Sequence, residues 1–385
     1  MLALCGDVMT GRGIDQILPH PGDPRLQEPY VTSALRYVEL AEAANGTIRR
    51  PADYAYIWGD ALAAFDRAQP AARIVNLETS ITTSSERWPK DIHYRMHPEN
   101  VACLAAAGID CCALANNHLM DCGYTGLAET LETLERAGIA ACGAGLDQPQ
   151  AEAPAIIEAP GQGRVLVYSC ATTTSGVPPE WGAGPDAPGV NLLADLSDAA
   201  AARIADRVRS EKKPGDIAVV SIHWGGNWGY RIPADQVRFA HRLTETGGVD
   251  VVHGHSSHHA KGVEIHQGKL ILYGCGDFLN DYEGIGGYEG YRGDLSLMYL
   301  PTVETESGRL KRLELVPFQV RQFRLKRARH GDAHWLRDTL NREGRRFGTQ
   351  FTLTDDRTLT LTRFAAQAAS RVRERGEDQD DATVT

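Results

Sequence analysis

The stretch Val252-His253-Gly254-His255-Ser256-Ser257-His258-His259 places four imidazoles within seven residues, around one glycine. Histidine nitrogen binds zinc, manganese, iron and nickel, and a glycine lets the backbone turn tightly enough for neighbouring imidazoles to converge. The preceding residues 249–252 are mostly β-branched valines bounded by glycines, which predicts a buried strand that ends at the histidines. These features indicate a metal site, with a solvated histidine-rich loop as the alternative.

Strand-like and helical segments alternate along residues 1–300, and this alternation predicts an α/β fold. The predicted strands are residues 2–5, 72–76, 111–115, 140–142, 164–170, 216–222, 249–252 and 269–273, and the predicted helices include residues 124–137, 199–210 and 233–245. Residues 20–60 lack a strong period and predict a long, partly helical insertion near the mouth of any site. Strand-like runs in residues 294–330 predict a β-rich second sheet that closes the domain.

The pattern divides the chain into three parts. Residues 1–330 form the main domain in this prediction. Residues 331–370 form a small α+β appendage, with a helix at 334–347 and a hairpin at 351–361. Residues 371–385 are charged and contain few apolar residues, so we expect a disordered tail.

Composition argues against several classes of protein. A chain of 385 residues with 42% hydrophobic content can bury a large core. A net charge of −10 and the lack of a basic, aromatic stripe argue against a nucleic-acid partner. No apolar run reaches the roughly 18 residues of a membrane span, and no signal peptide precedes the first strand. We therefore expect a cytoplasmic protein without a membrane anchor. The sequence leaves open whether the protein forms a homo-oligomer.

The eight cysteines show no CxxC pair, and several lie in apolar, strand-like or helical contexts. They predict small buried side chains in a reducing compartment, and they argue against a structural zinc site built from thiolates.

Successive strand-like runs end in side chains that can bind a metal ion. In chain order these are Asp7, Glu78, Asn117, His223, His255 and His258. Each one taken alone is more typical of a turn or a cap, but ligands at strand ends recur in α/β enzymes. A dinuclear centre needs this inventory of carboxylates, an amide oxygen and imidazoles.

Six sequence blocks carry a resemblance to a known family. They are Gly6-Asp7-Val8-Met9-Thr10-Gly11-Arg12, Asn76-Leu77-Glu78, Ala115-Asn116-Asn117-His118-Leu119-Met120-Asp121-Cys122-Gly123, Ser221-Ile222-His223-Trp224-Gly225, Gly254-His255-Ser256-Ser257-His258 and Tyr273-Gly274-Cys275-Gly276-Asp277-Phe278. This series resembles the bacterial capsule-synthesis proteins of the CapA/PgsA type, which are associated with poly-γ-glutamate capsules. Those proteins resemble, more distantly, the calcineurin-like metallophosphoesterases. The resemblance implies a four-layer α/β/β/α sandwich with its site at strand ends between two sheets.

The resemblance also implies a role for each candidate ligand. Asp7 would bind a first ion, and Glu78 would bridge two ions. The second ion would be held by Asn117, His223 and His255. His258 would return to the first ion, and the ions would be manganese, zinc or iron.

Four more residues are predicted to act around the metal. The resemblance makes His118 a general acid that protonates a leaving oxygen or nitrogen. Asp277 is an extra ligand or a base, with a turn-capping aspartate as the alternative. Arg12 and Arg95 are candidates to hold a substrate carboxylate or phosphate through a bidentate fork, and for Arg95 a solvated surface position is the alternative.

Two positions depart from the patterns of the resembled proteins. Met9 stands where phosphoesterases have a histidine. The first ion would therefore have one ligand fewer, and a mononuclear site is the alternative. Asp277 stands where capsule-synthesis proteins often have an asparagine, which adds a carboxylate. Residues 281–291, with three tyrosines among glycines, resemble a flap over the site, and a glycine-rich surface loop is the alternative.

These residues lead to three functional hypotheses. The first is a metal-dependent hydrolase that uses a metal-activated hydroxide on a phosphoester or amide bond of a small anionic substrate. The second is an accessory or catalytic component of poly-γ-glutamate or related amide-bond synthesis. The third is a structural metal-binding domain with no open coordination position.

Overall fold

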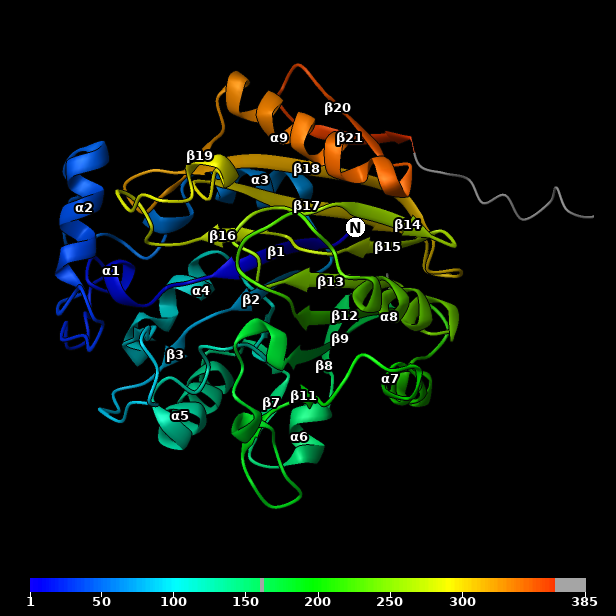
Figure 1. The fold of residues 1–385 in the computed structure, drawn as a ribbon, viewed down its shortest axis with the longest axis horizontal. Coiled ribbons are helices and arrows are strands. Elements are labelled where there is room, and N and C mark those ends of the chain that lie inside the picture. Colours follow the sequence, from blue (N-terminus) through cyan, green and yellow to red (C-terminus); the bar gives the residue numbers. More distant parts are fainter. Residues whose placement is uncertain (160–162, 364–385) are drawn as a thin grey trace, which may run out of the picture.

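The computed structural model describes residues 1–159 and 163–363, and two large β-sheets organise them (Figure 1). The predicted disordered tail lies outside the described residues. The first sheet runs in the order β20-β21-β18-β17-β1-β2-β5-β6, with β16 beside β1 and β19 beside β18. Its strands are β1 (Ala3–Val8), β2 (Arg73–Leu77), β5 (Cys111–Ala113), β6 (Ala140–Cys142), β16 (Asp277–Leu279), β17 (Leu295–Val303), β18 (Leu310–Val320), β19 (Leu325–Arg327), β20 (Gln350–Leu353) and β21 (Leu359–Arg363).

The second sheet runs in the order β11-β9-β12-β13-β15-β14, with β8 beside β9. Its strands are β8 (Ala155–Ala159), β9 (Gly163–Thr172), β11 (Leu192–Leu193), β12 (Ile217–His223), β13 (Val251–His255), β14 (Val263–His266) and β15 (Lys269–Leu272). Two short pairs complete the strands, β3 (Ser80–Ile81) with β4 (Arg95–Met96) and β7 (Ala144–Gly145) with β10 (Gly189–Val190).

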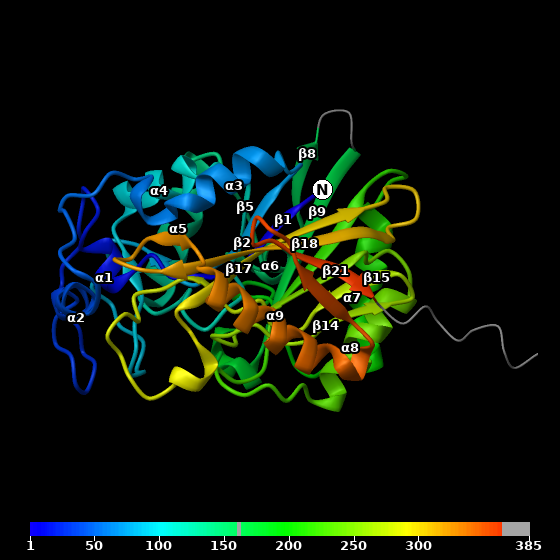
Figure 2. The same ribbon diagram turned by 90° about the horizontal axis from the view of Figure 1, so that it is seen from above.

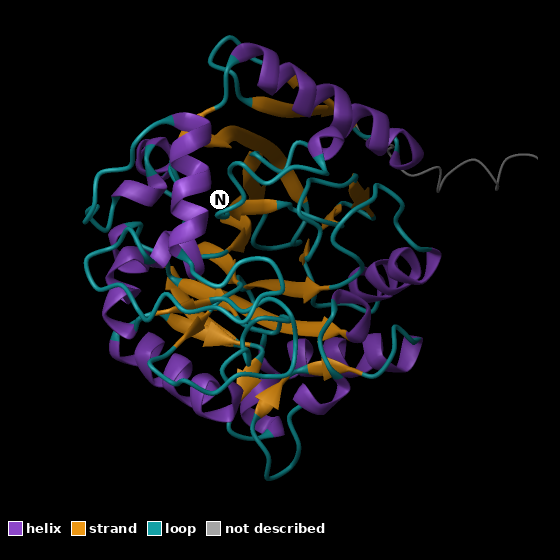
Figure 3. Cartoon of the chain, turned by 60° about the vertical axis from the view of Figure 1, so that its left-hand side comes forward, coloured by secondary structure: helices purple, strands orange, loops and turns teal. Residues whose placement is uncertain are grey.

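Helices surround these sheets (Figure 3). They are α1 (Arg12–Asp15), α2 (Leu35–Asn45), α3 (Asp60–Ala68), α4 (Ala102–Ala106), α5 (Gly123–Arg136), α6 (Gln148–Glu152), α7 (Asp198–Glu211), α8 (Ala234–Glu245) and α9 (His330–Gly344). Short 3₁₀ turns occur at Tyr56–Trp58, Pro98–Val101, Thr173–Ser175, Pro179–Trp181, Glu289–Tyr291 and Arg345–Phe347. Among the described helices, none has the length and apolar character needed to cross a bilayer.

Three clusters of buried apolar side chains hold the elements together. One lies between the first sheet and helices α1 to α5, and includes Phe65 and Leu127. The second lies between the two sheets, and includes Leu4 and Val219. The third lies between the second sheet and helices α7 and α8, and includes Phe239. The two sheets therefore pack face to face, and the predicted α/β fold is confirmed.

The core strands lie close to where their local patterns placed them. β6 spans the predicted residues 140–142, β12 differs from its prediction by one residue at each end, and β15 ends one residue earlier than predicted. The predicted helices at 124–137, 199–210 and 233–245 appear as α5, α7 and α8. The eight cysteines are free and buried, as the sequence predicts.

The strands in residues 294–330 do not form a second sheet, and that prediction is wrong. β17 pairs antiparallel with β1 through Leu4 opposite Tyr299 and Cys5 opposite Met298. β18 then pairs with β17, so both strands extend the first sheet. The second sheet is built instead from the segment between Ala155 and Leu272.

The C-terminal helix and hairpin are present, and they join the main body of the protein. β21 pairs with β18, which continues the first sheet (Figure 2). Side chains of α9 and the hairpin, among them Leu336, Leu340 and Phe351, belong to the cluster between the two sheets. Thr349 Oγ1 donates to the carbonyl of Val263 in β14 over 2.8 Å.

One irregularity in β1 controls which way its last residues face. Leu2 and Leu4 belong to the cluster between the sheets, whereas Ala3 and Cys5 belong to the helix side. Strict alternation would put Asp7 on the helix side with Cys5. The register of β1 on β2 shifts between Cys5 and Asp7, and Val8 lies on the helix side. Asp7 therefore faces the second sheet.

Gly6 lies within this irregularity, and we predict that Gly6→Ala destabilises the fold. A Cβ atom at Gly6 would overlap the carbonyl oxygen of Gly276. The free energy of unfolding should fall by about 1–3 kcal/mol, as for other overpacking changes. Urea denaturation measures this, with Gly226→Ala as the control because its Cβ would meet no atom within 4 Å. Equal unfolding midpoints for the two variants would contradict the close packing of Gly6.

Candidate metal centre

Asp7, near the carboxyl end of β1, lies beside Asp277, the first residue of β16, so two carboxylates come together. The strand registers pair Asp7 with Asn76 on one side and with Asp277 on the other. Asn76 Nδ2 donates to Asp7 Oδ1 over 2.7 Å, and Asn280 Nδ2 donates to Asp277 Oδ2 over 2.8 Å. Both carboxylates are buried. An amide therefore fixes each carboxylate at the strand ends.

The ends of β12 and β13 bring two imidazoles together. The register places His223 opposite His255, with their Nδ1 atoms 2.8 Å apart. His223 Nε2 lies 2.9 Å from Asn117 Oδ1, and His255 Nε2 lies 2.8 Å from Ser221 Oγ. Burial lowers the pKa of both imidazoles well below the usual range. Neutral imidazole is the form that binds a metal ion.

Asp7 joins the two sheets at this point. Its Oδ1 lies 3.8 Å from His255 Nδ1, and its Oδ2 accepts a hydrogen bond of 3.3 Å from the backbone N–H of Ser256. Asp7, His223 and His255 offer ligand atoms that all lie within 4.8 Å of one another. Asp7 forms a second such group with His258 and Asp277. The two groups thus share one carboxylate.

A strained turn carries His258 back to the first sheet. Ser256 has a φ of 95°, a conformation that is uncommon for residues with a side chain. His258 Nδ1 then lies 2.8 Å from Asp277 Oδ1. Burial lowers the pKa of His258, but the Asp277 carboxylate outweighs burial and raises it.

Glu78 adds a third buried carboxylate, and it has an unpaired oxygen. Its Oε2 atom has no hydrogen-bond partner within the described part of the chain. Burial, reinforced by Asp277, raises the pKa of Asp7 to about 7, and burial together with Asp7 raises the pKa of Glu78 well above its usual range. A divalent cation would supply the missing positive charge, and this set of carboxylate and imidazole donors fits manganese, zinc or iron.

The loop after β5 places His118 beside Glu78. His118 Nε2 lies 3.7 Å from Glu78 Oε1, while its Nδ1 lies 2.7 Å from Asp121 Oδ2. Lys90 Nζ donates to Asp121 Oδ1 over 2.7 Å and also to the carbonyl of Asn117. Burial lowers the pKa of His118 to about 4. Asp121 and Lys90 therefore orient the imidazole, with Nε2 toward the carboxylates.

The sequence patterns did not predict Asp121 or Lys90 as site residues. Asp121 lies three residues after His118, within one of the blocks that carry the family resemblance. That spacing was its one available signal. Lys90 lies in the loop between β3 and β4, where no motif marks it.

A cavity of about 990 Å³ opens next to the centre, and His258 is part of its wall. Aromatic rings from separate segments line it, namely Tyr30, Tyr37, Tyr94, Trp228, Tyr282 and Tyr288. The insertion at residues 20–60 and the glycine-rich segment 281–291 both contribute to this wall, as expected for segments near the mouth of a site. Trp228 and Tyr288 stack across it, with ring centroids 4.2 Å apart and planes 4° apart.

The two predicted substrate-binding arginines differ in position. Arg12 is 4% exposed and lines the cavity, but its guanidinium already donates to Asp281 over 2.5 and 3.1 Å and to Glu28 over 3.0 Å. A substrate anion would have to displace one of these carboxylates. Arg95 donates to the carbonyls of Ser84 and Asp23 and does not line the cavity. The structure therefore leaves neither guanidinium free at the centre.

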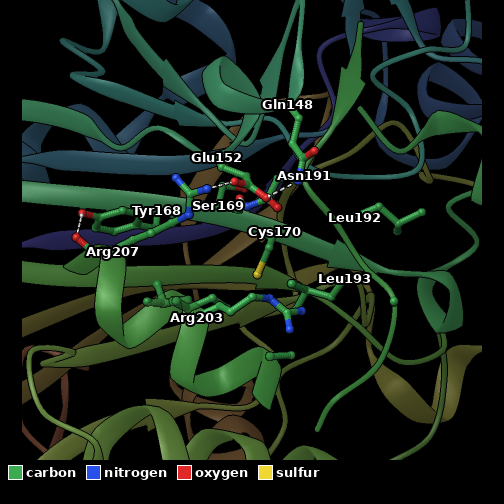
Figure 4. A pocket seen from close by; sticks show the side chains of 14 residues that line it. Gln148, Glu152, Tyr168, Ser169, Cys170, Asn191, Leu192, Leu193, Arg203 and Arg207 are labelled. Carbon is green, nitrogen blue, oxygen red and sulfur yellow. Dashed lines mark hydrogen bonds and ion pairs between the residues drawn. The ribbon is translucent and has the colours of Figure 1, made fainter. Parts of the chain in front are cut away.

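A second cavity, of about 390 Å³, lies on the second sheet beside α6 and α7 (Figure 4). Its floor is apolar, with Cys170 and Val220. At its rim Arg207 pairs with Glu152, and Asn191 Nδ2 donates to the carbonyl of Ser169 over 2.8 Å. The wall of this cavity holds none of the predicted site residues.

A third group of possible ligands lies elsewhere on the second sheet. His241, Glu264 and His266 offer ligand atoms within 4.8 Å of one another. His241 Nε2 lies 3.0 Å from Glu264, and His266 Nε2 lies 2.9 Å from Glu245. The two rings stack 3.7 Å apart with planes 6° apart, so their nitrogens do not point at one position. We interpret this group as a hydrogen-bonded surface network.

The structure thus gathers the predicted residues Asp7, Glu78, Asn117, His118, His223, His255, His258 and Asp277 around one place between the sheets. Their individual roles stay predictions. The third hypothesis, a closed structural site, requires every donor to be matched, whereas here a large cavity adjoins the ligands.

Comparison with known proteins identifies relatives of this chain. A family model described as bacterial capsule synthesis protein PGA_cap matches residues 1–282. A probable polyglutamine synthesis accessory protein of Mycobacterium tuberculosis is 48% identical over 360 residues, which cover 93% of this chain and 94% of the relative. The PGA biosynthesis protein CapA of Bacillus subtilis is 27% identical over 278 residues, or 72% of this chain and 62% of the relative.

The capsule biosynthesis protein CapA of Bacillus anthracis is 25% identical over 282 residues, which cover 73% of this chain and 59% of that relative. The matched region contains every residue of the candidate centre, from Asp7 to Asp277. This chain therefore belongs to the bacterial capsule-synthesis (PGA_cap) family, within the metallophosphoesterase-like superfamily.

Proposed function

We propose that this chain is a metal-dependent component of poly-γ-glutamate or related amide-bond synthesis. The observation that carries the proposal is the pair of ligand groups that share Asp7 beside a cavity of about 990 Å³. The family match and the names of the relatives support a role in polymer synthesis, since those proteins are named for capsule, PGA or polyglutamine synthesis. These names favour a role in polymer synthesis over hydrolysis of a phosphoester.

The ligand groups suggest how one or two ions would be held. Asp7, His258 and Asp277 would hold the first ion, and His223 and His255 would hold the second with Asp7. Asn117 and Glu78 lie within reach to complete these sets. When bound, the metal supplies Lewis-acid activation and positive charge. Asp277 would supply a ligand in place of the histidine that phosphoesterases have at the position of Met9.

The chain's own groups would then act on the substrate. His118 carries or accepts a proton at Nε2, and its hydrogen bond to Asp121 fixes which nitrogen faces Glu78. Lys90 neutralises Asp121 and holds the Asn117 backbone. We propose a small anionic substrate, since a bound cation would attract its charge. We also propose a cytoplasmic setting, since the eight cysteines are free, as is typical of a reducing compartment.

The oriented His118–Asp121 pair also favours a second candidate function, hydrolysis of a phosphoester or amide bond. Such an arrangement is useful for proton transfer to a leaving group. Metal-loaded protein should be tested on a chromogenic phosphodiester, a phosphomonoester and a γ-glutamyl amide, and its binding of γ-glutamyl oligomers should be measured by calorimetry. Oligomer binding without turnover of the phosphate esters supports the synthesis component. Rapid turnover of a phosphate ester without oligomer binding supports the hydrolase.

We predict that His255→Ala loses most of the bound metal, because the change removes a ligand atom from the group that contains Asp7 and His223. Elemental analysis of the purified protein gives the metal stoichiometry per chain. His259→Ala is the matched control, since His259 is also buried but lies outside both ligand groups. Full metal content in His255→Ala would remove the core of the assignment.

Asp277→Asn should selectively weaken the first ion. The change keeps the size of the side chain but removes the charge that faces His258 and Asp7. During dialysis against increasing chelator, this variant should release one ion earlier than the wild type and keep the other. If the two proteins release metal identically, Asp277 is not a ligand.

His118→Ala should retain metal and slow turnover by on the order of 100-fold, because His118 would transfer a proton and not bind the ion. Asp121→Asn should have a smaller effect in the same direction, since the imidazole stays but loses its orienting carboxylate. Rates are measured on the substrate that the assay panel identifies. Metal loss in His118→Ala would place that imidazole among the ligands instead.

A further inference from the structure

Two tyrosines meet at the wall of the cavity beside the centre. Tyr94 lies just before β4, and Tyr282 lies three residues after β16, yet the hydroxyl of Tyr94 donates to that of Tyr282 over 3.2 Å. The Tyr94 ring packs edge-on against His118, with centroids 4.6 Å apart and planes 88° apart. The Tyr282 ring packs in the same way against His258, at 5.4 Å and 87°. The pair therefore spans from the proton-transfer residue to the ligands of the first ion.

The guanidinium of Arg12 packs against the rings of this tyrosine pair. Its guanidinium lies 4.3 Å from the ring centroid of Tyr94 and 6.0 Å from that of Tyr282. Asp281 and Glu28 hold the guanidinium in place from separate segments. Four of the five N–H groups of Arg12 are thereby used, three toward these carboxylates and one toward the Tyr37 hydroxyl, so little of the guanidinium is left for a substrate. It acts as a rigid, positively charged support for two aromatic rings.

The hydroxyl pair keeps one unused proton. Each phenol has one O–H group, and a hydrogen bond between two hydroxyls consumes only one of the two protons. Within residues 1–159 and 163–363, the Tyr282 hydroxyl donates to no protein acceptor. Both tyrosines line the cavity. A donor next to the centre is therefore available to an acceptor that enters from the cavity.

We infer that the Tyr94–Tyr282 pair is an oxyanion-binding subsite, in which Tyr282 donates its hydroxyl proton to an anionic oxygen of the substrate. Tyr94 is a positioning residue, because its own hydrogen bond to Tyr282 directs and polarises that hydroxyl. The oxygen belongs to a phosphoryl group or to a carboxylate, and both present the same acceptor. The inference rests on the proposed function, in that the substrate is taken to reach the metal centre through this cavity.

The test compares anion binding by wild-type protein and four variants, each loaded with manganese. Calorimetric titration with inorganic phosphate and, separately, with γ-glutamylglutamate distinguishes the two sources of the oxygen. Tyr282→Phe keeps the ring against His258 but removes the donor, and it should weaken binding of the preferred anion by about 10-fold or more. Tyr288→Phe is the control, because Tyr288 lines the same cavity and stacks on Trp228, with no part in the hydroxyl pair.

Tyr94→Phe and the double variant separate positioning from simple structural support. Tyr94→Phe should weaken binding by less than Tyr282→Phe, and the double variant should bind no more weakly than Tyr282→Phe alone. Additive losses would contradict the assigned role of Tyr94, because a merely structural contribution would persist without the Tyr282 hydroxyl.

Metal stoichiometry, measured in the same samples, keeps the two proposals apart. A wild-type protein that holds no metal overturns the proposed function. A metal-loaded Tyr282→Phe that binds both anions as tightly as the wild type overturns the subsite and leaves the metal centre standing. The same holds if the loaded wild type binds neither anion.

Discussion

One register shift in β1 determines where the candidate centre can exist. The shift occurs around Gly6, after Cys5 has faced the helices and before Val8 does so again. It turns Asp7 toward the second sheet, where the carboxylate contacts His255 and the backbone of Ser256. A regular strand would have buried the same carboxylate among apolar helix side chains, far from any imidazole. The donors contributed by the two sheets can share an ion only because this strand breaks its alternation.

The sequence predicts the strands and helices of the α/β body well, because their signals are local. Apolar runs such as residues 140–142 and helical periods such as residues 124–137 depend on adjacent residues, and the structure has β6 and α5 there. Pairing between distant strands leaves no such local signal. The strand at Leu295–Val303 looks the same whether it starts a new sheet or pairs with β1, and the structure shows the second arrangement. The hairpin after α9 also joins the first sheet, and its local sequence pattern gives no signal of that pairing.

The candidate site divides along similar lines. Residues at the carboxyl ends of strands, such as His223 and His255, could be predicted because parallel strand ends converge at one edge. Residues on longer loops that no motif marks, such as Lys90, could not. Tertiary packing determines the positions of Tyr282 and Lys90, and no residue spacing in the sequence indicates those positions. Arg12 illustrates the converse error, since its partner Asp281 lies 269 residues away and occupies the guanidinium that a substrate was expected to use.

The pairing of β17 with β1 extends the first sheet beyond the residues that the family model matches. The family model matches residues 1–282, which include every ligand, yet the edge of β1 is covered by a strand that begins at Leu295. Leu297 and Tyr299 of that strand also fill the space between the two sheets. The stretch that the family model matches therefore lacks a strand that the first sheet contains. An isolated piece ending at residue 282 would present an open strand edge and an unfilled core, and would be prone to self-association.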